Sequence, residues 1–165
     1  MIHAVLDLRD RVVERVMTPR VDIVSVNEDA PASEILQLAM TTKYSRIPVC
    51  RRGVDDIVGI VFSKDLLQSI SLQPHNVSAA TPSSSSSSSS SSPLPLATAS
   101  SWDTLTAGQL MEPTFYIPET MSSWAALQEM RKRRVHMCIV VDEYGGTSGL
   151  VTFEDILEEV VGEVR

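Results

Sequence analysis

Along this chain, segments with the apolar pattern of a β-strand alternate with segments that have the apolar spacing of an α-helix. Short runs rich in β-branched residues predict strands at residues 22–26, 47–50, 57–62, 114–117, 138–141 and 148–151. Apolar residues spaced three or four positions apart predict amphipathic helices at residues 5–16, 31–40, 63–70, 122–134 and 153–161. After the first helix, each half of the chain therefore follows the order β-α-β-β-α. The expected fold class is α+β.

The same order of polar and apolar residues occurs twice. Residues 59–65 (GIVFSKD) and 149–155 (GLVTFED) each place a glycine before a short strand and an aspartate one turn into the next helix. The offset between the copies falls from 94 positions at Met17 and Met111 to 90 at Gly59 and Gly149. This slow drift fits small loop deletions in an internal repeat, so we expect two half-domains that pack on each other.

Two segments lie outside the repeat. Residues 1–16 are predicted to form an N-terminal linker helix. Residues 71–101 contain ten consecutive serines, at positions 83–92, flanked by prolines and small residues. Such a tract buries too little apolar surface to offset its chain entropy, so we expect a disordered serine-rich loop.

The charge balance narrows the classes of partner. The chain has 14 Lys and Arg against 21 Asp and Glu, a net charge of −7. Since nucleic-acid backbones attract basic surfaces, this balance argues against nucleic acid. A phosphate ligand would need local cations or a metal ion to offset repulsion. No stretch reaches the roughly 18 consecutive apolar residues of a membrane span, and residues 1–20 lack a secretory apolar core.

Sequence motifs of enzymes and metal sites are absent. There is no His-Glu-x-x-His, Cys-x-x-Cys, Gly-x-Ser-x-Gly or phosphate loop, so we expect no enzyme and no metal ligands. The acidic residues near the end of the chain suit a solvated helix face, with magnesium contacts as the alternative. Cys50 and Cys138 lie in apolar runs, which favours buried reduced thiols; a disulfide would require their strands to align.

Thr152 and Asp155 are the strongest candidates for ligand chemistry. A carboxylate offers two acceptor oxygens, to which the adjacent hydroxyls of a ribose can donate together. A threonine where a strand passes into a helix can donate to a phosphate, beside helix N–H groups that point outward. The same spacing is also that of a helix capping box. The residues alone leave both interpretations open, and the two are compatible.

The motif Gly-x-x-Thr-x-x-Asp inside a duplicated β-α-β-β-α unit resembles the CBS domain, and a pair of such units resembles a Bateman module. Five segments together resemble the cyclin-M/CorC (hemolysin-like) family of magnesium and cobalt efflux-related membrane proteins, which has plastid members. They are VMTPR at 16–20, YSRIPV at 44–49, VHM at 135–137, DEYGGT at 142–147 and GLVTFEDILEEVVGE at 149–163. The resemblance implies CBS repeats at 17–70 and 102–165, packed as a pseudo-twofold pair.

The resemblance also implies a ligand. In such modules a regulatory adenine nucleotide, ATP or AMP, with or without Mg²⁺, binds where the second repeat meets the entry strand of the first. Asp155 would then hold the ribose hydroxyls, and Thr152 and Arg46 would face phosphate. The other implied contacts surround the adenine: Thr18, Ile23, Tyr44, Ser45, Ile47 and Pro48, with His136 as an extra contact. Ordinary packing, capping or surface pairing is the alternative role for Thr18, Tyr44, Arg46 and His136.

The first repeat departs from this pattern. Phe62 stands where the second repeat has Thr152, and Glu112 stands where the first has Thr18. A bulky apolar group and an acid replace two polar contacts, so we expect the site at Asp65 to be degenerate or weak. The resemblance further implies homodimers, a transmembrane domain of the same protein, and a place on the cytosolic or plastid stromal face of a membrane. The alternative is a structural dimerisation module with a vestigial pocket.

Overall fold

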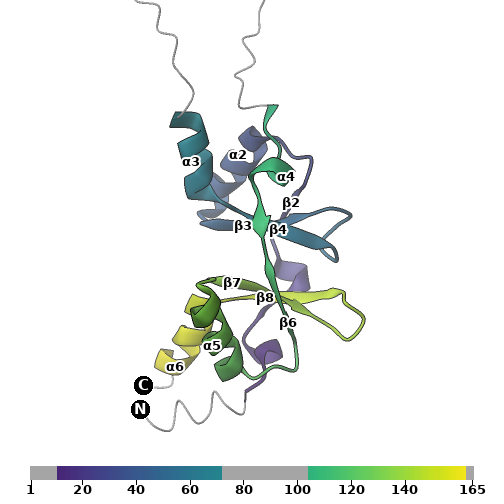
Figure 1. The fold of residues 1–165 in the computed structure, drawn as a ribbon, viewed down its shortest axis with the longest axis vertical. Helices are drawn as coiled ribbons and strands as arrows, with labels where there is room; N and C mark the ends of the chain where they lie inside the picture. Colours follow the sequence, from purple (N-terminus) through teal and green to yellow (C-terminus); the bar gives the residue numbers. More distant parts are fainter. Residues whose placement is uncertain (1–10, 72–103, 163–165) are drawn as a thin grey trace, which may run out of the picture.

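The computed structural model describes residues 11–71 and 104–162 of the 165-residue chain. Two lobes are stacked along the long axis of the molecule, each built from a four-stranded sheet with helices on its outer side (Figure 1). The segment through β5 and β6 runs from one lobe to the other (Figure 1). This arrangement confirms the predicted α+β class and the two half-domains.

The first lobe has the strand order β2-β3-β4-β5. Its strands are β2 (Val26–Asn27), β3 (Arg46–Cys50), β4 (Ile57–Phe62) and β5 (Glu112–Pro113). Its helices are α2 (Ala32–Thr42), α3 (Ser63–Ser71) and α4 (Ala107–Leu110). The β2–β3 pair is parallel, whereas β3–β4 and β4–β5 are antiparallel.

The second lobe has the strand order β1-β8-β7-β6. Its strands are β1 (Thr18–Pro19), β6 (Phe115–Pro118), β7 (Met137–Val141) and β8 (Thr147–Thr152). Its helices are α5 (Ser123–Arg133) and α6 (Phe153–Gly162). Two 3₁₀ turns, η1 (Val13–Arg15) and η2 (Arg20–Asp22), flank β1.

The two repeats exchange their first strands. The strand β1 belongs to the first repeat but pairs antiparallel with β8, while β5 belongs to the second repeat and pairs with β4. Glycines make this close approach possible. A Cβ at Gly149 would lie 2.4 Å from the Thr18 carbonyl oxygen, and one at Gly59 would lie 2.9 Å from that of Glu112. In each repeat, the glycine of the duplicated motif therefore lies against the first strand of the other repeat.

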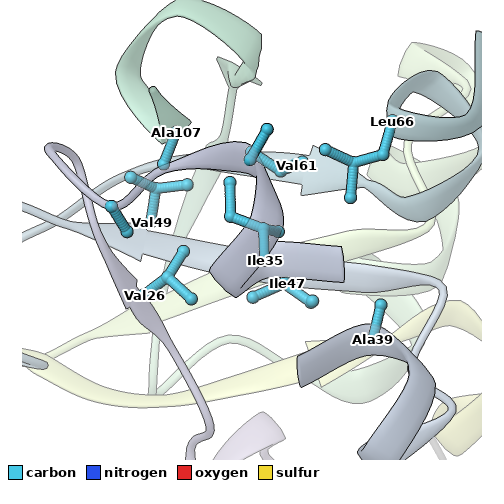
Figure 2. Close-up of a cluster of buried hydrophobic side chains, with 10 residues drawn as sticks. Val26, Ile35, Ala39, Ile47, Val49, Val61, Leu66 and Ala107 are labelled. Atoms are coloured by element: carbon cyan, nitrogen blue, oxygen red, sulfur yellow. The ribbon is translucent and has the colours of Figure 1, made fainter. Parts of the chain in front are cut away.

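Each lobe has its own apolar core. In the first lobe, Ile35 of α2 packs over Ile47 and Val49 of β3, with Val61 and Leu66 alongside (Figure 2). A second cluster, centred on fully buried Met130, Cys138 and Ile156, fills the other lobe. A third cluster joins the lobes through β4, β7 and β8, and its buried members are Ile23, Ile57, Ile60, Met137, Ile139 and Leu150. The hydrophobic effect thus stabilises the packing of the two lobes on each other as well as each lobe.

Several predicted elements need correction. The strand predicted at 22–26 is wrong: η2 ends at Asp22, residues 23–25 form no regular element, and β2 begins only at Val26. Of the helix predicted at 5–16, residues 5–10 lie outside the described residues. The rest is a 3₁₀ turn, because Val12 pairs with Ser122 and Val13 is fully buried in the second lobe. Most of the predicted disordered loop at 71–101 also lies outside the described residues. The two cysteines are buried and free, as predicted.

Candidate functional site

A cavity of about 450 Å³ lies where the exchanged strand β1 meets the second repeat, and we call it the Asp155 cavity. Its floor and walls come from both repeats. The lining residues are Thr18, Asp22, Ile23, Val24, Lys43, Tyr44, Ser45, Arg46, Pro48, Met137, Leu150, Thr152, Glu154 and Asp155. The volume falls within the roughly 300–1,000 Å³ typical of small-molecule sites.

Strand pairing positions the polar residues of this cavity. Thr18 lies opposite Leu150 on β8, two residues before Thr152. Thr152 is the last residue of β8 and lies opposite Met137 on β7. Because β8 runs directly into α6, Asp155 sits in the first turn of that helix, beside the end of the strand. The antiparallel register therefore brings residues 18 and 155 to the same cavity.

Thr152 and Asp155 form a capping box. The Thr152 backbone N–H donates to Asp155 Oδ2 at 3.1 Å, and the Asp155 backbone N–H donates to Thr152 Oγ1 at 3.1 Å. The cap occupies only part of their capacity. The threonine hydroxyl keeps its proton to donate, and the carboxylate keeps further lone pairs, including both on Oδ1. The capping role is confirmed, and it leaves these side chains able to bind a ligand.

Arg46 stands at the polar end of the cavity. It begins β3, its side chain is 23% exposed, and its Nη1 lies 3.6 Å from Glu154 Oε1. Its Nε is buried and has no hydrogen-bond partner among the described residues. An unpaired buried donor is costly, so an incoming acceptor would gain a strong, charge-assisted bond here. Lys43, in the left-handed conformation at the end of α2, adds a second cation.

Part of the cavity lining is apolar. Ile23, Met137 and Leu150 are buried and belong to the cluster that joins the lobes. Pro48 is also buried, whereas Tyr44 is 53% exposed at the rim. A flat aromatic group could lie against these aliphatic side chains with its polar edge toward Thr18. The cavity lining thus combines apolar side chains, a hydroxyl and carboxylate pair, and two cations.

Eight of the ten predicted site residues line this cavity. Ile47 does not, because its side chain is 1% exposed and points into the first core beside α2 (Figure 2). His136 does not either; it lines a neighbouring cavity, and its Nδ1 lies 3.8 Å from Glu154 Oε1. The lining residues that sequence reasoning missed are Asp22, Val24, Lys43, Met137, Leu150 and Glu154. Of these, Glu154 lies inside the quoted motif beside Asp155, which was the available signal.

The neighbouring cavity has a volume of about 560 Å³, and we call it the Lys64 cavity. Its lining residues are Ser45, Arg46, Ile60, Phe62, Ser63, Lys64, Glu112, Pro113, Thr114, Phe115, Arg134, Val135, His136 and Met137. By the offsets of the repeat, Glu112, Arg134 and Phe62 correspond to Thr18, Lys43 and Thr152. Asp65, the counterpart of Asp155, is not among the lining residues.

Two groups away from the Asp155 cavity have raised pKa values. Burial raises the pKa of the Cys138 thiol to about 12, against the opposing effect of the nearby Arg133 charge. Burial, and then the charge of Asp56, raises the pKa of Tyr116. The Tyr116 hydroxyl donates to the Ile57 carbonyl oxygen at 2.6 Å and so ties β6 to the first lobe. Both groups are structural.

Comparisons with known proteins identify the family of this fold. A family model of the CBS domain matches residues 13–72 and 107–162. The chain belongs to the CBS-domain family. This CBS pair is 37% identical, with a TM-score of 0.77, to the CBS domain of the bacterial CNNM/CorC family Mg²⁺ transporter in complex with ATP, covering 99% of this chain and 96% of that one. The pair is therefore of the CNNM/CorC type.

Two full-length relatives show how much of a protein this CBS pair represents. A chloroplastic DUF21 domain-containing protein of Arabidopsis thaliana is 36% identical over 164 residues, which is 99% of this chain and 21% of the relative. A UPF0053 protein of Mycobacterium tuberculosis is 35% identical over 164 residues, which is 99% of this chain and 32% of the relative. The CBS pair spans a third or less of these relatives.

Two further searches concern the described residues only. No helix within 11–71 and 104–162 combines the length and hydropathy needed to cross a lipid bilayer. Over the same ranges, no group of three or more His, Cys, Asp or Glu side chains is arranged to hold a metal ion.

Proposed function

We propose that this CBS pair binds an adenine nucleotide in the Asp155 cavity and so regulates a membrane magnesium or cobalt transporter of which it is a part. The main support is the composition of the cavity. Its lining combines apolar side chains, a hydroxyl and carboxylate pair and two cations, which are the groups that a base, a sugar and a phosphate chain require. The similar bacterial structure is a complex with ATP.

Each part of the ligand has a chemical counterpart. Adenine lies against Ile23, Pro48 and Leu150, with Thr18 able to bond its polar edge. The ribose hydroxyls donate to the free lone pairs of Asp155. Thr152 donates to the first phosphate, at the N-terminus of α6, where the helix dipole favours an anion.

Arg46 meets the rest of the phosphate chain. In the structure its nearest anion is Glu154, which is 59% exposed and free to move aside. Because the lining also includes Asp22 and Glu154, a nucleoside polyphosphate would bind best with Mg²⁺. Magnesium usually reaches such sites on substrate phosphates with one or two carboxylates. ATP with Mg²⁺ therefore fits this cavity better than the free nucleotide does.

Regulation would pass through α6 to the start of the described chain. The helix carries Asp155 in its first turn and Glu159 one turn later, where Glu159 pairs with Arg11. The Arg11 carbonyl oxygen also accepts from Ser123 N at 2.8 Å. A ligand that shifts α6 would thus bias the segment before β1. That segment would lead to the transmembrane domain, with the CBS pair on the cytosolic or stromal side. Coupling is limited by the difference in ligand affinity between the two arrangements.

Calorimetric titration of the chain with ATP and Mg²⁺ tests this function. We expect Asp155→Asn to weaken ATP and adenosine alike by at least about tenfold, since it removes a charge-assisted pair of bonds to the sugar. Asn can still accept the Thr152 N–H bond, so the fold should persist. Asp65→Asn is the matched control, because it removes the equivalent carboxylate of the other repeat. Equal effects of the two substitutions would contradict the assignment.

A second candidate is a structural dimerisation module with a vestigial pocket. Leu67 on α3 and Leu157 on α6 occupy equivalent positions of the two repeats, and they are 58% and 39% exposed. Paired apolar residues on the outer helices suit a contact with a second copy. Under this function, millimolar ATP would give no heat and no shift in melting temperature, whatever stands at position 155.

A further inference from the structure

We propose that the Lys64 cavity is a second site, for a phosphate-class anion and not for a nucleoside, which shares Arg46 with the Asp155 cavity. Three cations line it, Arg46, Lys64 and Arg134, against the single carboxylate of Glu112. The chain as a whole has a net charge of −7, so a concentration of cations around one hollow is a local feature. Such a hollow raises the local concentration of anions.

The cations are held in place by their surroundings. Lys64 Nζ lies 5.2 Å from the centre of the Phe62 ring, close enough for a cation–π attraction. Arg134 ends α5 in the left-handed conformation, with its backbone N–H bonded to the carbonyl oxygens of Arg131 and Met130. Arg133 lies over the Phe115 ring, which also lines the cavity, at 4.3 Å from the ring centre. The Phe62 ring thus helps to position one of the three lining cations, Lys64, while Arg133 lies beside the lining.

Two buried polar atoms of the lining have unused bonding capacity. Arg46 Nε and Thr114 Oγ1 are inaccessible to solvent and lack a hydrogen-bond partner among the residues that the structure describes. Ser63 begins α3, a nine-residue helix, so the positive end of its dipole also meets the cavity. An anion with several oxygens would bond to the guanidinium, the hydroxyls and Lys64 at once.

The same lining disfavours a nucleoside. The carboxylate that could hold ribose hydroxyls is missing, because Asp65 does not line this cavity, and Phe62 replaces the threonine of the other repeat. Glu112 is exposed and weakens the attraction for anions. It does not lie in the first turn of a helix, as Asp155 does, so it does not replace the carboxylate that would hold a ribose. The ligand class is therefore a compact phosphate, whether a free anion or the phosphate chain of a nucleotide seated in the Asp155 cavity.

Titration with sodium pyrophosphate, without any nucleoside, tests this site. We expect binding to the unmodified chain, weakened about tenfold or more in a Lys64→Gln, Arg134→Asn double variant. Asn tolerates the left-handed conformation at position 134. The matched control is Lys132→Gln with Arg131→Gln, which removes two exposed cations of α5 that do not line the cavity. Failure of pyrophosphate to bind, or equal weakening by the control pair, would overturn the proposal.

Two further arms identify the source of the phosphate and separate this proposal from the nucleotide one. Pyrophosphate binding that persists at saturating ATP indicates a free anion, whereas competition with ATP but not with adenosine indicates the nucleotide's own phosphates. Asp155→Asn should leave pyrophosphate affinity within about twofold, since position 155 is outside this lining. Loss of pyrophosphate binding in Asp155→Asn would contradict a separate site, even if nucleotide binding were also lost.

Discussion

The Asp155 cavity and the Lys64 cavity derive from equivalent parts of a duplicated unit, yet their linings have opposite charge. The first contains two cations, Lys43 and Arg46, and three carboxylates. The second contains three cations and one carboxylate. Most of this difference arises because Lys64 stands where the other repeat has Glu154, and because the second lining has no counterpart of the Asp22 and Asp155 carboxylates. Glu112, where the other repeat has Thr18, acts in the opposite direction.

The comparison separates what the fold requires from what a ligand requires. Both repeats keep a glycine opposite the exchanged strand, a helix that begins directly after the last strand, and a left-handed residue at the end of the preceding helix. These features build a cavity from backbone. The side chains around it differ freely, because a cavity wall tolerates changes that a packed core does not. Function is therefore expected to differ between the cavities even though the fold does not.

We expect the largest effect from Gly149→Ala, which disrupts the close approach of β1 to β8 beside the Asp155 cavity. The new Cβ would lie 2.4 Å from the Thr18 carbonyl oxygen, which cannot move without displacing β1. We expect a loss of about 2 kcal/mol in the free energy of unfolding, within the range for overpacked sites. Urea denaturation measures this loss, and ATP titration should show weaker binding while pyrophosphate binding changes little.

Gly59→Ala is the matched control for that substitution. Its nearest contact, at 2.6 Å, is Met111 Sδ, which lies on a flexible side chain, and the Glu112 carbonyl oxygen is 2.9 Å away. We expect a smaller loss of stability and the converse pattern of binding, with pyrophosphate weakened and ATP nearly unchanged. If both substitutions weaken both ligands equally, the two cavities are not independent and the comparison fails.

Sequence alone predicted the elements that carry a clear periodic signal. The strand at 57–62 and the helices after Phe62 and Thr152 were predicted almost to the residue. The Thr152–Asp155 capping box was also foreseen, because its signal is local in sequence. Thr152 and Asp155 were candidates from their own chemistry. The other six predicted residues that line the cavity followed from resemblance to a family, which supplies spatial neighbours that no periodic pattern contains.

The elements that sequence missed are short or set by distant contacts. Strands β1 and β5 have two residues each, too few for an alternation, and α4 has four. The run from Val21 to Val26 is rich in β-branched residues, but no strand forms before Val26. η2 ends at Asp22, and Ile23 packs in the cluster between the lobes. Ile47 and Pro48 are neighbours on one strand, and only the sheet geometry shows which of them faces the core.

A substitution with an intermediate expected effect replaces a residue of one cavity with the equivalent residue of the other. Thr18→Glu gives the Asp155 cavity the acid that Glu112 supplies to the other cavity. Because Thr18 is proposed to bond the polar edge of adenine, a carboxylate there removes that bond and is buried against the base. It should weaken ATP and adenosine alike, by about tenfold. Titration with both ligands measures the ratio. Thr120→Glu, at an exposed position outside both linings, is the control for the added charge. A loss confined to ATP would place position 18 beside the phosphates and contradict the proposed binding mode.

The smallest expected effect concerns the one acid that faces Arg46. Glu154 Oε1 lies 3.6 Å from Arg46 Nη1, and the equivalent residue of the first repeat is Lys64, so position 154 opposes phosphate where position 64 favours it. The Glu154 side chain is 59% exposed, and exposed pairs contribute little, about 0–1 kcal/mol. We therefore expect Glu154→Gln to strengthen ATP binding about threefold by releasing Arg46. Glu158→Gln removes an exposed carboxylate of the same helix outside the lining and should change nothing. Weaker binding in Glu154→Gln would mean that Glu154 orients Arg46 for the ligand, and the acid would then belong to the site.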